Sequence, residues 1–254
     1  MAIVDIERDG AVRTIRLNRP EKRNAMNNDM LNALLDAFSE APSAEERVNV
    51  ICSEGAVFCA GRDLRETSAG GPQVDIEAVF YAVETYPLPV VARVQGAAIA
   101  GGCELALHCD FVVAAESAMF GMSLAQIGLA PTWFLAKKLL ETAGPVGARE
   151  ILLLGDPLPA SRLCDLGVIS RVAAAEELDD ALHTIVDRLQ RNAPLSLRAI
   201  KALLLREMTY RDRIAHDDVD LLVRAARKSP DALEGMQARL DKREPRFEGK
   251  SGDG

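Results

Sequence analysis

The sequence predicts an α/β fold with parallel strand pairing, followed by a region made of helices. In the first half of the 254 residues, short apolar runs alternate with segments of helical periodicity, which is typical of α/β units. From about Trp133 onward apolar residues recur at helical spacing, so we expect this half to be nearly all helix. Hydrophobic residues make up 48% of the chain, which is enough for a full core in one domain with appendages or in one and a half domains.

The first half of the chain predicts strands joined by loops and helices. The apolar runs that predict strands are residues 3–7, 12–17, 48–52, 90–94 and 111–115. Helical segments are expected over about 73–85 and within 96–107. Asp9 and Gly10, between the first two runs, form a hairpin turn signal, and Asn27 or Asn28 is expected to cap a first helix. The Gly-rich stretch 67–72 is predicted to be mobile.

The second half predicts helices that pack on another subunit. Periodic apolar residues place helices over 177–191, 195–208, 211–227 and 231–243. Pro194 and Pro230 stand near the starts of two of them, where proline is favoured. A helical region with few aromatic residues favours contacts between subunits, and the alternative is a helical cap on the chain's own core. The tail REPRFEGKSGDG is expected to be disordered at its end.

Charge and apolar patterning exclude several classes of function. The net charge is −8 and no block of Lys and Arg is present, so we expect no nucleic-acid partner. No apolar run approaches the roughly 18–20 residues of a membrane span. The first ten residues, MAIVDIERDG, carry charges, unlike a signal peptide. We therefore expect a cytoplasmic protein without membrane contact, whose acidic surface still allows an anionic small ligand in a locally positive pocket.

The spacing of cysteine and histidine residues indicates neither disulfides nor a metal site. The cysteines are Cys52, Cys59, Cys103, Cys109 and Cys164, an odd count without a CxxC pair. Four of them lie in apolar runs, which favours buried free thiols in a reducing compartment. The three histidines are scattered without ligand spacing, so we expect no resident metal.

Two segments combine an apolar strand, a turn of small residues and a helix or loop. They are VFCAGRDL (57–64) and GAAIAGGCELAL (96–107). Small residues let a ligand approach the backbone, and a turn into a helix leaves N–H groups unpaired. Two such groups that converge on one oxygen would form an oxyanion hole, although tight packing explains such turns about as often. Glu104 lies in the second segment among apolar residues, either as a working carboxylate or as a buried one satisfied by a partner.

Taken together, these motifs resemble one enzyme superfamily. AGRDL and GAAIAGGCELALHCD, with NRPEKRNAM before them and FGMSLAQIGLAP after them, resemble the enoyl-CoA hydratase/isomerase (crotonase) superfamily, from about residue 3 to residue 249. The resemblance implies a crotonase-like spiral of ββα repeats over 1–190 that binds acyl-CoA. It also implies a helical trimerisation region with a flexible tail over 191–254. The implied substrate is an acyl thioester of coenzyme A, so no separate cofactor is expected, and the implied assembly is a homotrimer or a dimer of trimers.

The resemblance also assigns roles to individual residues. The backbone N–H groups of Arg62 and Gly101 would form the oxyanion hole, and Glu104 falls on one of the two catalytic glutamates of the hydratases. Contacts with CoA or substrate would come from Lys22, Arg23, Ala60, Asp63, Leu64, Arg65, Leu124 and Trp133. The Arg62 side chain would be solvated, with only its amide used, or would pair with a CoA phosphate. Burial is expected to raise the pKa of Glu104 toward the range useful for proton transfer.

The chain departs from the family pattern at the second glutamate. Counting within FGMSLAQIGLAP places Leu124 at that position, and leucine neither holds a water nor carries a proton. The nearby polar side chains of Ser123, Gln126 and Thr132 are poor acid–base catalysts. Three interpretations stay open: Glu104 alone supports hydration, dehydration or isomerisation; the enolate serves another reaction, such as decarboxylation or thioester hydrolysis; or the chain binds acyl-CoA without catalysis.

Overall fold

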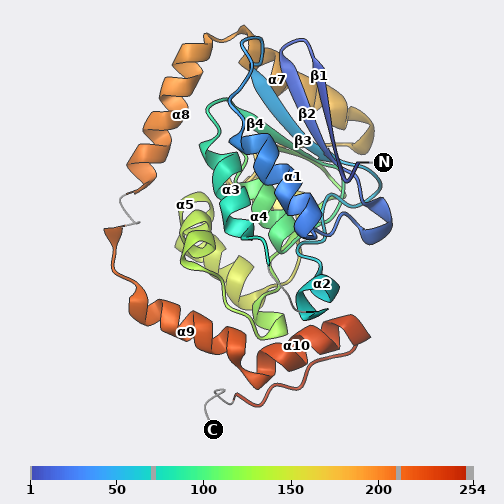
Figure 1. The fold of residues 1–254 in the computed structure, drawn as a ribbon, viewed down its shortest axis with the longest axis vertical. Helices are drawn as coiled ribbons and strands as arrows, with labels where there is room; N and C mark the ends of the chain where they lie inside the picture. The colour runs from blue at the N-terminus through green and yellow to red at the C-terminus, as the bar shows by residue number, and fades with distance from the viewer. Residues whose placement is uncertain (1, 70–72, 210–212, 250–254) are drawn as a thin grey trace.

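The protein is built around a large central sheet (Figure 1). The structure is a computed structural model that describes residues 2–69, 73–209 and 213–249. The strand order of this sheet is β1-β2-β3-β4-β6-β9. Its strands are β1 (Val4–Asp9), β2 (Val12–Leu17), β3 (Val48–Ser53), β4 (Val90–Val94), β6 (Phe111–Ala115) and β9 (Arg171–Ala173). A small second sheet contains β5 (Ala98–Ile99), β7 (Met119–Gly121) and β8 (Leu158–Pro159).

Helices surround the large sheet and make up most of the C-terminal part (Figure 1). The α-helices are α1 (Asn28–Ser39), α2 (Leu64–Ala69), α3 (Ile76–Thr85), α4 (Gly101–Leu107), α5 (Trp133–Arg149), α6 (Ala160–Asp165), α7 (Leu178–Arg191), α8 (Pro194–Met208), α9 (Asp217–Lys228) and α10 (Pro230–Asp241). Shorter helical segments are η1 (Pro20–Lys22), η2 (Ala125–Ile127), η3 (Glu150–Leu154) and η4 (Ala175–Glu177). Within the described ranges, no helix has the length and apolar character that crossing a membrane requires.

The large sheet confirms the predicted parallel pairing. β1 and β2 form the predicted hairpin, in which Asp9 faces Val12 and Gly10 takes a φ of +55° in the turn. Every following neighbour pairs in parallel, from β2 with β3 to β6 with β9. Parallel neighbours need a crossover connection, and α1 and α3 supply it for the first two pairs.

The central strands bury both of their faces. On one face Ile51 and Ala92 belong to the main core, together with residues of α1, α3 and α4. On the other face Val50 and Val91 pack in a second cluster with Leu182 of α7. Figure 1 shows α1 and α3 on one side of the sheet and α7 on the other. Because alternate residues of a strand point to opposite faces, burial of both faces explains why these strands read as continuous apolar runs.

The expectation of nearly continuous helix after Trp133 was wrong between α5 and α7. There β8 joins the small sheet antiparallel to β7, and β9 extends the large sheet beside β6. β9 contains only three residues, with Val172 as its one β-branched side chain. A strand this short carries no period-2 pattern, so its pairing with β6 decides its conformation.

Several predicted boundaries shift where local chemistry decides them. The helix expected over 73–85 begins at Ile76, because the Asp75 side chain accepts the Glu77 N–H at 3.0 Å. The cap of α1 is Asn27, one of the two predicted candidates. The Gly-rich stretch 67–72 was expected to be mobile. Its first residues instead belong to α2, which ends at Ala69. Parts of three predictions, on the Gly-rich stretch, the helix before α10 and the tail, lie outside the described residues at 70–72, 210–212 and 250–254.

Two C-terminal helices, α8 and α9, lie at the periphery of the molecule, whereas α10 lies against the rest of the protein (Figure 1). Exposed large apolar side chains of α8 and α9 are Leu195, Leu203, Leu204, Ile200, Val219, Leu221 and Leu222. By contrast, α10 packs closely on η2, since a Cβ added to Gly235 would lie 2.4 Å from the carbonyl carbon of Ile127. Exposed apolar surface of this extent indicates a face that contacts another molecule.

A buried arginine ties α1 to the sheet. Arg13 of β2 is 1% exposed, donates to the carbonyl oxygen of Ala37 at 2.9 Å, and places Nε 3.6 Å from the Glu46 carboxylate. Its guanidinium lies over the rings of Phe38 and Tyr86, at 5.4 and 4.8 Å from their centroids. Tyr86 donates its hydroxyl to Glu46 at 2.7 Å. Both buried charges are therefore compensated.

Loss of this arginine should destabilise the fold strongly. Arg13→Ala leaves the Glu46 carboxylate buried without its cation, which should lower the free energy of unfolding by about 3–5 kcal/mol. Arg16→Ala on the same strand removes a half-exposed pair with Glu54 at 3.3 Å and should cost less than about 1 kcal/mol. Urea unfolding of both variants measures the difference. Equal losses of stability would contradict the role assigned to Arg13.

Candidate active site

The loop after β2 and the turn after β3 lie side by side. The Met26 N–H donates to the Gly61 oxygen at 2.8 Å, and the Asp63 N–H donates to the Met26 oxygen at 2.9 Å. Further along, the Ala60 N–H donates to the Arg23 oxygen at 3.0 Å. These backbone bonds join two motifs that stand far apart in the sequence into one short parallel bridge.

A buried asparagine, which sequence reasoning missed, fixes this loop. Asn24 is fully buried and donates its amide to the carbonyl oxygens of Glu54 and Val57, both at 2.8 Å. Its side-chain oxygen accepts the Arg19 N–H at 2.8 Å. Asn24 also has a φ of +52°, a left-handed conformation that asparagine tolerates better than most residues. An asparagine within a polar loop is common, so the sequence carried no clear signal of this role.

The turn before α4 holds its backbone in a strained conformation. Ala100 has a φ of +49° and a ψ of −121°, which a residue with a Cβ rarely adopts. Its N–H donates to the Gly121 oxygen at 2.7 Å, and the preceding Ile99 N–H donates to the Cys59 oxygen at 2.9 Å. Such strain costs about 1–3 kcal/mol and persists only where surrounding contacts hold it.

Glycine lets the two turns approach each other closely. A Cβ added to Gly102 would lie 2.2 Å from the carbonyl oxygen of Cys59, so no other residue fits there. A Cβ added to Gly101 would lie 3.7 Å from the Arg62 nitrogen, which places the two backbones next to each other. Neither the Arg62 N–H nor the Gly101 N–H donates to an acceptor in the described residues. The structure thus brings together the two residues predicted to form an oxyanion hole.

Glu104 lies one helical turn after Gly101, inside the protein. Only 8% of its surface is exposed, and its Oε1 atom has no hydrogen-bond partner among the described residues. Burial, and after it the negative charge of Glu77, raises the pKa of the Glu104 carboxyl to about 8, against a lowering effect of Arg227. At neutral pH the group therefore holds its proton, which is a state suited to proton transfer.

The next turn of α4 is held by a buried ionic cluster. The ring of His108 is stacked between Phe80 and Phe134, with centroid distances of 5.7 and 4.5 Å. Its Nδ1 lies 3.5 Å from the Glu84 carboxylate, and Lys138 of α5 lies 2.7 Å from the same group. Burial acts to raise the pKa of Glu84, but His108 and Lys138 outweigh it and hold the pKa at about 2. The cluster ties α3, α4 and α5 together.

The Arg62 side chain is bound to protein, which corrects the expectation that it is simply solvated. Its guanidinium donates to the carbonyl oxygen of Val74 at 2.7 Å and to the side-chain oxygens of Asn28, at 2.8 Å, and Gln73. The group is therefore not simply solvated, and its pairing with a CoA phosphate stays a prediction. The side chain joins the start of α1 to the segment before α3, while the Arg62 backbone N–H stays unengaged.

The other residues predicted to contact CoA differ in how the protein uses them. Lys22, Arg23 and Arg65 expose their side chains beside the paired backbones. Asp63 instead forms an ion pair with Arg19 at 3.2 Å. Ala60 and Leu64 are half-buried. The exposed cations lie where an anionic ligand can reach them, whereas Asp63 helps to fix the loop.

Leu124 and Trp133 are both largely apolar side chains. The indole Nε1 of Trp133 is the one polar side-chain atom of the two. Leu124 is half-buried and packs against the main core, so it contributes no carboxylate at its position. The ring of Trp133 stacks on His216 at 4.3 Å between centroids, and His216 Nδ1 lies 3.0 Å from an Asp220 oxygen. The buried Nε1 of Trp133 has no hydrogen-bond partner in the described part of the chain. A bound ligand with an acceptor atom would satisfy this N–H.

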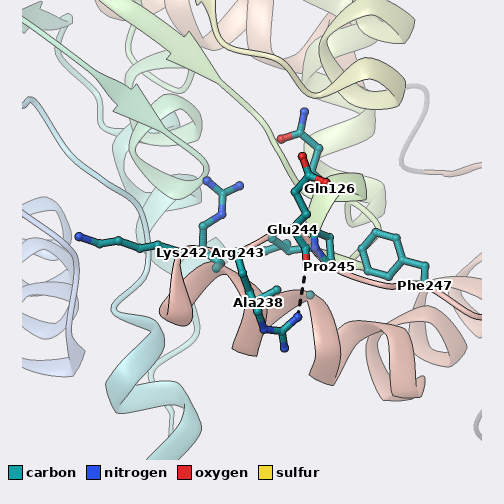
Figure 2. A pocket seen from close by; sticks show the side chains of 10 residues that line it. Gln126, Ala238, Lys242, Arg243, Glu244, Pro245 and Phe247 are labelled. Carbon is teal, nitrogen blue, oxygen red and sulfur yellow. Dashed lines mark hydrogen bonds between the residues drawn. The ribbon is translucent and has the colours of Figure 1, made fainter.

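Two cavities lie near the elements described above. In the larger of the two, the arginine side chains bind other side chains of the protein. This larger cavity has a volume of about 570 Å³ and lies between η2, α10 and the segment that follows α10 (Figure 2). Of its arginines, Arg239 donates to the Ser123 hydroxyl at 2.9 Å, and Arg243 pairs with Glu234 at 2.6 Å. Figure 2 shows the Lys242 side chain extending away from the other labelled residues.

The smaller cavity, of about 370 Å³, lies between α9 and the first turns of α3 and α5. Its lining residues are Glu77, Thr132, Trp133, Phe134, His216, Asp220, Val223, Arg224 and Arg227. Glu77 and Arg227 are also the two charged residues that affect the pKa of Glu104, which does not itself line this cavity. Sequence reasoning missed both residues, because charged side chains at the start or on the surface of a helix are ordinary. In the described ranges, no cluster of three or more side chains could hold a metal ion.

Comparison with known proteins decides the family. A family model described as enoyl-CoA hydratase/isomerase matches residues 7–250. The chain belongs to the enoyl-CoA hydratase/isomerase family. A putative enoyl-CoA hydratase of Thermus thermophilus is 34% identical, over 96% of this chain and 100% of its own length.

Solved structures of this enzyme family confirm the predicted crotonase-like α/β fold with C-terminal helices. A methylmalonyl-CoA decarboxylase is 25% identical, with a TM-score of 0.89 and 98% of each chain covered. A carnitinyl-CoA hydratase from Mycobacterium avium is 31% identical, with a TM-score of 0.88, over 98% of this chain and 100% of its own. These relatives include hydratases and a decarboxylase, so similarity alone does not choose one reaction.

Burial of Glu104 should make stability depend on pH in a defined direction. The folded state keeps this proton up to about pH 8, whereas the unfolded chain loses it near pH 4.5. The folded state therefore binds more protons between these values, so the free energy of unfolding falls as pH rises through this window, by roughly 3–5 kcal/mol for this group. Glu104→Gln removes the effect and should be more stable than the wild type at pH 8.

Urea unfolding at pH 5 and pH 8, at one protein concentration, measures this effect. We expect the stability difference between Glu104→Gln and the wild type to grow toward pH 8. A difference that stays constant between the two pH values would show that Glu104 titrates normally.

Proposed function

We propose that the protein is an enoyl-CoA hydratase or isomerase whose reaction passes through an enolate. The Arg62 and Gly101 N–H groups would stabilise the thioester oxygen, and Glu104 would move the proton. The observation that carries this proposal is the buried Glu104 carboxyl one helical turn after Gly101, whose Oε1 has no hydrogen-bond partner among the described residues. A carboxyl that is buried without a partner lowers stability, so its presence beside two unengaged N–H donors favours a catalytic use.

The chemistry of enoyl thioesters fits this arrangement. Attack at C3, or loss of a proton beside the carbonyl, moves negative charge onto the thioester oxygen. Two fixed N–H donors stabilise that charge, and loss of one such donor typically costs about 3–4 kcal/mol. Protonated Glu104 can then deliver its proton to C2, and its carboxylate can remove one in the reverse direction. The remaining predicted contacts would hold the substrate: Lys22, Arg23 and Arg65 its phosphates, and Leu124 its acyl chain.

Decarboxylation is the second candidate function. The structural similarity to methylmalonyl-CoA decarboxylase and the absence of a carboxylate at Leu124 both favour it. Loss of CO₂ from a malonyl-type thioester forms the same enolate, which the N–H pair would stabilise and protonated Glu104 would quench at C2. This reaction needs no activated water, so one carboxyl group suffices.

The activity assay separates these candidates. We expect the wild type to hydrate crotonyl-CoA or longer 2-enoyl-CoA esters, followed as loss of the conjugated thioester absorbance. Glu104→Gln should lower kcat by about 10²–10⁴-fold, because the amide cannot donate the proton.

Leu124→Glu should raise the rate, because it restores the second carboxylate. Activity in the hydration direction should fall above about pH 8, as Glu104 loses its proton.

Other outcomes of this assay point to the alternatives. Turnover of malonyl-type thioesters, without turnover of enoyl esters, would support the decarboxylase. If no ester turns over, and CoA-ester binding is unaffected by Glu104→Gln, the catalytic proposal is wrong and the chain is a non-catalytic acyl-CoA binder.

We also propose that α8 and α9 mediate assembly into a homotrimer or a dimer of trimers. Their exposed leucines support this, since α9 buries none of its residues within the described chain. Light scattering should give three or six times the chain mass of 27.4 kDa. Leu222→Asp, at a leucine that is 70% exposed, should lower that mass without unfolding the chain. A monomeric wild type would contradict the proposal.

A further inference from the structure

Hydration of an enoyl thioester, which this inference takes from the proposed function, needs a second proton acceptor. One group must take a proton from water as its oxygen attacks C3, while another delivers a proton to C2. Glu104 holds its proton at neutral pH and suits the delivery to C2. Leu124 cannot accept a proton from water. The structure must therefore supply a base from another element if the protein is a hydratase.

Glu77 lies on the element that packs against the predicted oxyanion hole. It occupies the first turn of α3, which is fixed in place by the Asp75 cap. The adjacent Ile76 reaches the site directly, since its Cδ1 lies 3.0 Å from where a Cβ on Gly101 would stand. The buried cluster around His108 holds α3 against α4 one turn further on. The start of α3 is thus fixed beside Gly101.

Glu77 lines the cavity, and its carboxylate forms no hydrogen bond or ion pair with the described residues. Its side chain is half-buried and lines the cavity together with Thr132 and Trp133. Among the charged groups, Glu77 contributes most to the raised pKa of Glu104. Arg227, across the same cavity, acts in the opposite direction.

The two carboxyl groups therefore differ in the way that acid–base catalysis needs. Glu104 is only 8% exposed, whereas Glu77 is half-buried and lines the cavity, where water can reach its carboxylate. A deeply buried carboxyl suits the role of the acid, and a carboxylate at the mouth of a cavity suits the role of the base.

We propose that Glu77 is the second catalytic carboxylate of this site and activates the attacking water. The Glu77 carboxylate takes one proton from water as the water oxygen bonds to C3. The C2–C3 π electrons move onto the thioester carbonyl to give the enolate, held by the Arg62 and Gly101 N–H groups. The enolate re-forms the carbonyl as C2 takes the proton of Glu104. Transfer of the proton from Glu77 to Glu104 then restores both groups.

A comparison of two reactions at the same site tests this role. Hydration of crotonyl-CoA at pH 7 requires both carboxyl groups. Exchange of the C2 protons of butyryl-CoA in deuterated buffer at pH 9, followed by NMR, requires only Glu104 as the base and the two N–H donors. Glu77→Gln should therefore lower the kcat of hydration by about 100-fold or more while C2 exchange persists. Glu104→Gln should abolish both reactions.

Matched variants exclude a general effect of charge or of the cavity. Asp218→Asn removes an exposed negative charge from α9 outside the cavity and should leave both reactions unchanged. Loss of hydration in His216→Gln, together with retention in Glu77→Gln, would move the base to the His216–Asp220 pair and overturn the proposal. Equal loss of hydration and exchange in Glu77→Gln would show that Glu77 only positions α3, which also overturns it.

The same measurements separate this inference from the proposed function. A wild type that exchanges C2 protons but hydrates no 2-enoyl ester would show that Glu77 does not activate water, while Glu104 and the N–H pair keep their roles. A wild type that does neither, with Glu104→Gln indistinguishable from it, would overturn the proposed function itself.

Discussion

The candidate site depends on one buried carboxyl group, Glu104, whose Oε1 has no hydrogen-bond partner in the described part of the chain. Removing an ionised carboxylate from water is unfavourable, so Glu104 keeps its proton at neutral pH. Such a group lowers stability, whereas the buried charges nearby lie in ion pairs. Glu84 binds both His108 and Lys138 beside the same helix, and Arg13 is stacked and paired beneath α1. The fold thereby holds a reactive group in a rigid setting.

The geometry of the two N–H donors depends on backbone conformation rather than on side-chain chemistry. Ala100 has a φ of +49° and donates its N–H to Gly121 of β7, and the missing Cβ of Gly102 lets the backbone of Cys59 approach. Asn24 secures the adjoining loop through three hydrogen bonds. Because none of these contacts uses the two donors themselves, the Arg62 and Gly101 N–H groups stay directed at whatever enters the site.

Sequence reasoning found the parts of the site that recur at fixed spacing and missed those made by packing. The resemblance of the motifs AGRDL and GAAIAGGCELALHCD to the crotonase superfamily implied that Arg62 and Gly101 act together, and alternating apolar runs predicted the parallel sheet. The three-residue strand β9 carries no period, so only its pairing with β6 shows it. The Arg62 guanidinium was misjudged because its partners, such as Val74, lie on elements whose approach is tertiary. Glu77 was missed for the same reason, since the packing of α3 places it at the cavity beside Trp133.

The most direct test of this account is a crystal structure with butyryl-CoA bound. It would show how the acyl thioester lies relative to both donors and both carboxyl groups. We predict that the thioester oxygen lies about 2.7–3.1 Å from the backbone nitrogens of Arg62 and Gly101, with C2 facing Glu104 and C3 facing Glu77. A thioester oxygen bound elsewhere, or a C2 atom turned away from Glu104, would contradict the account.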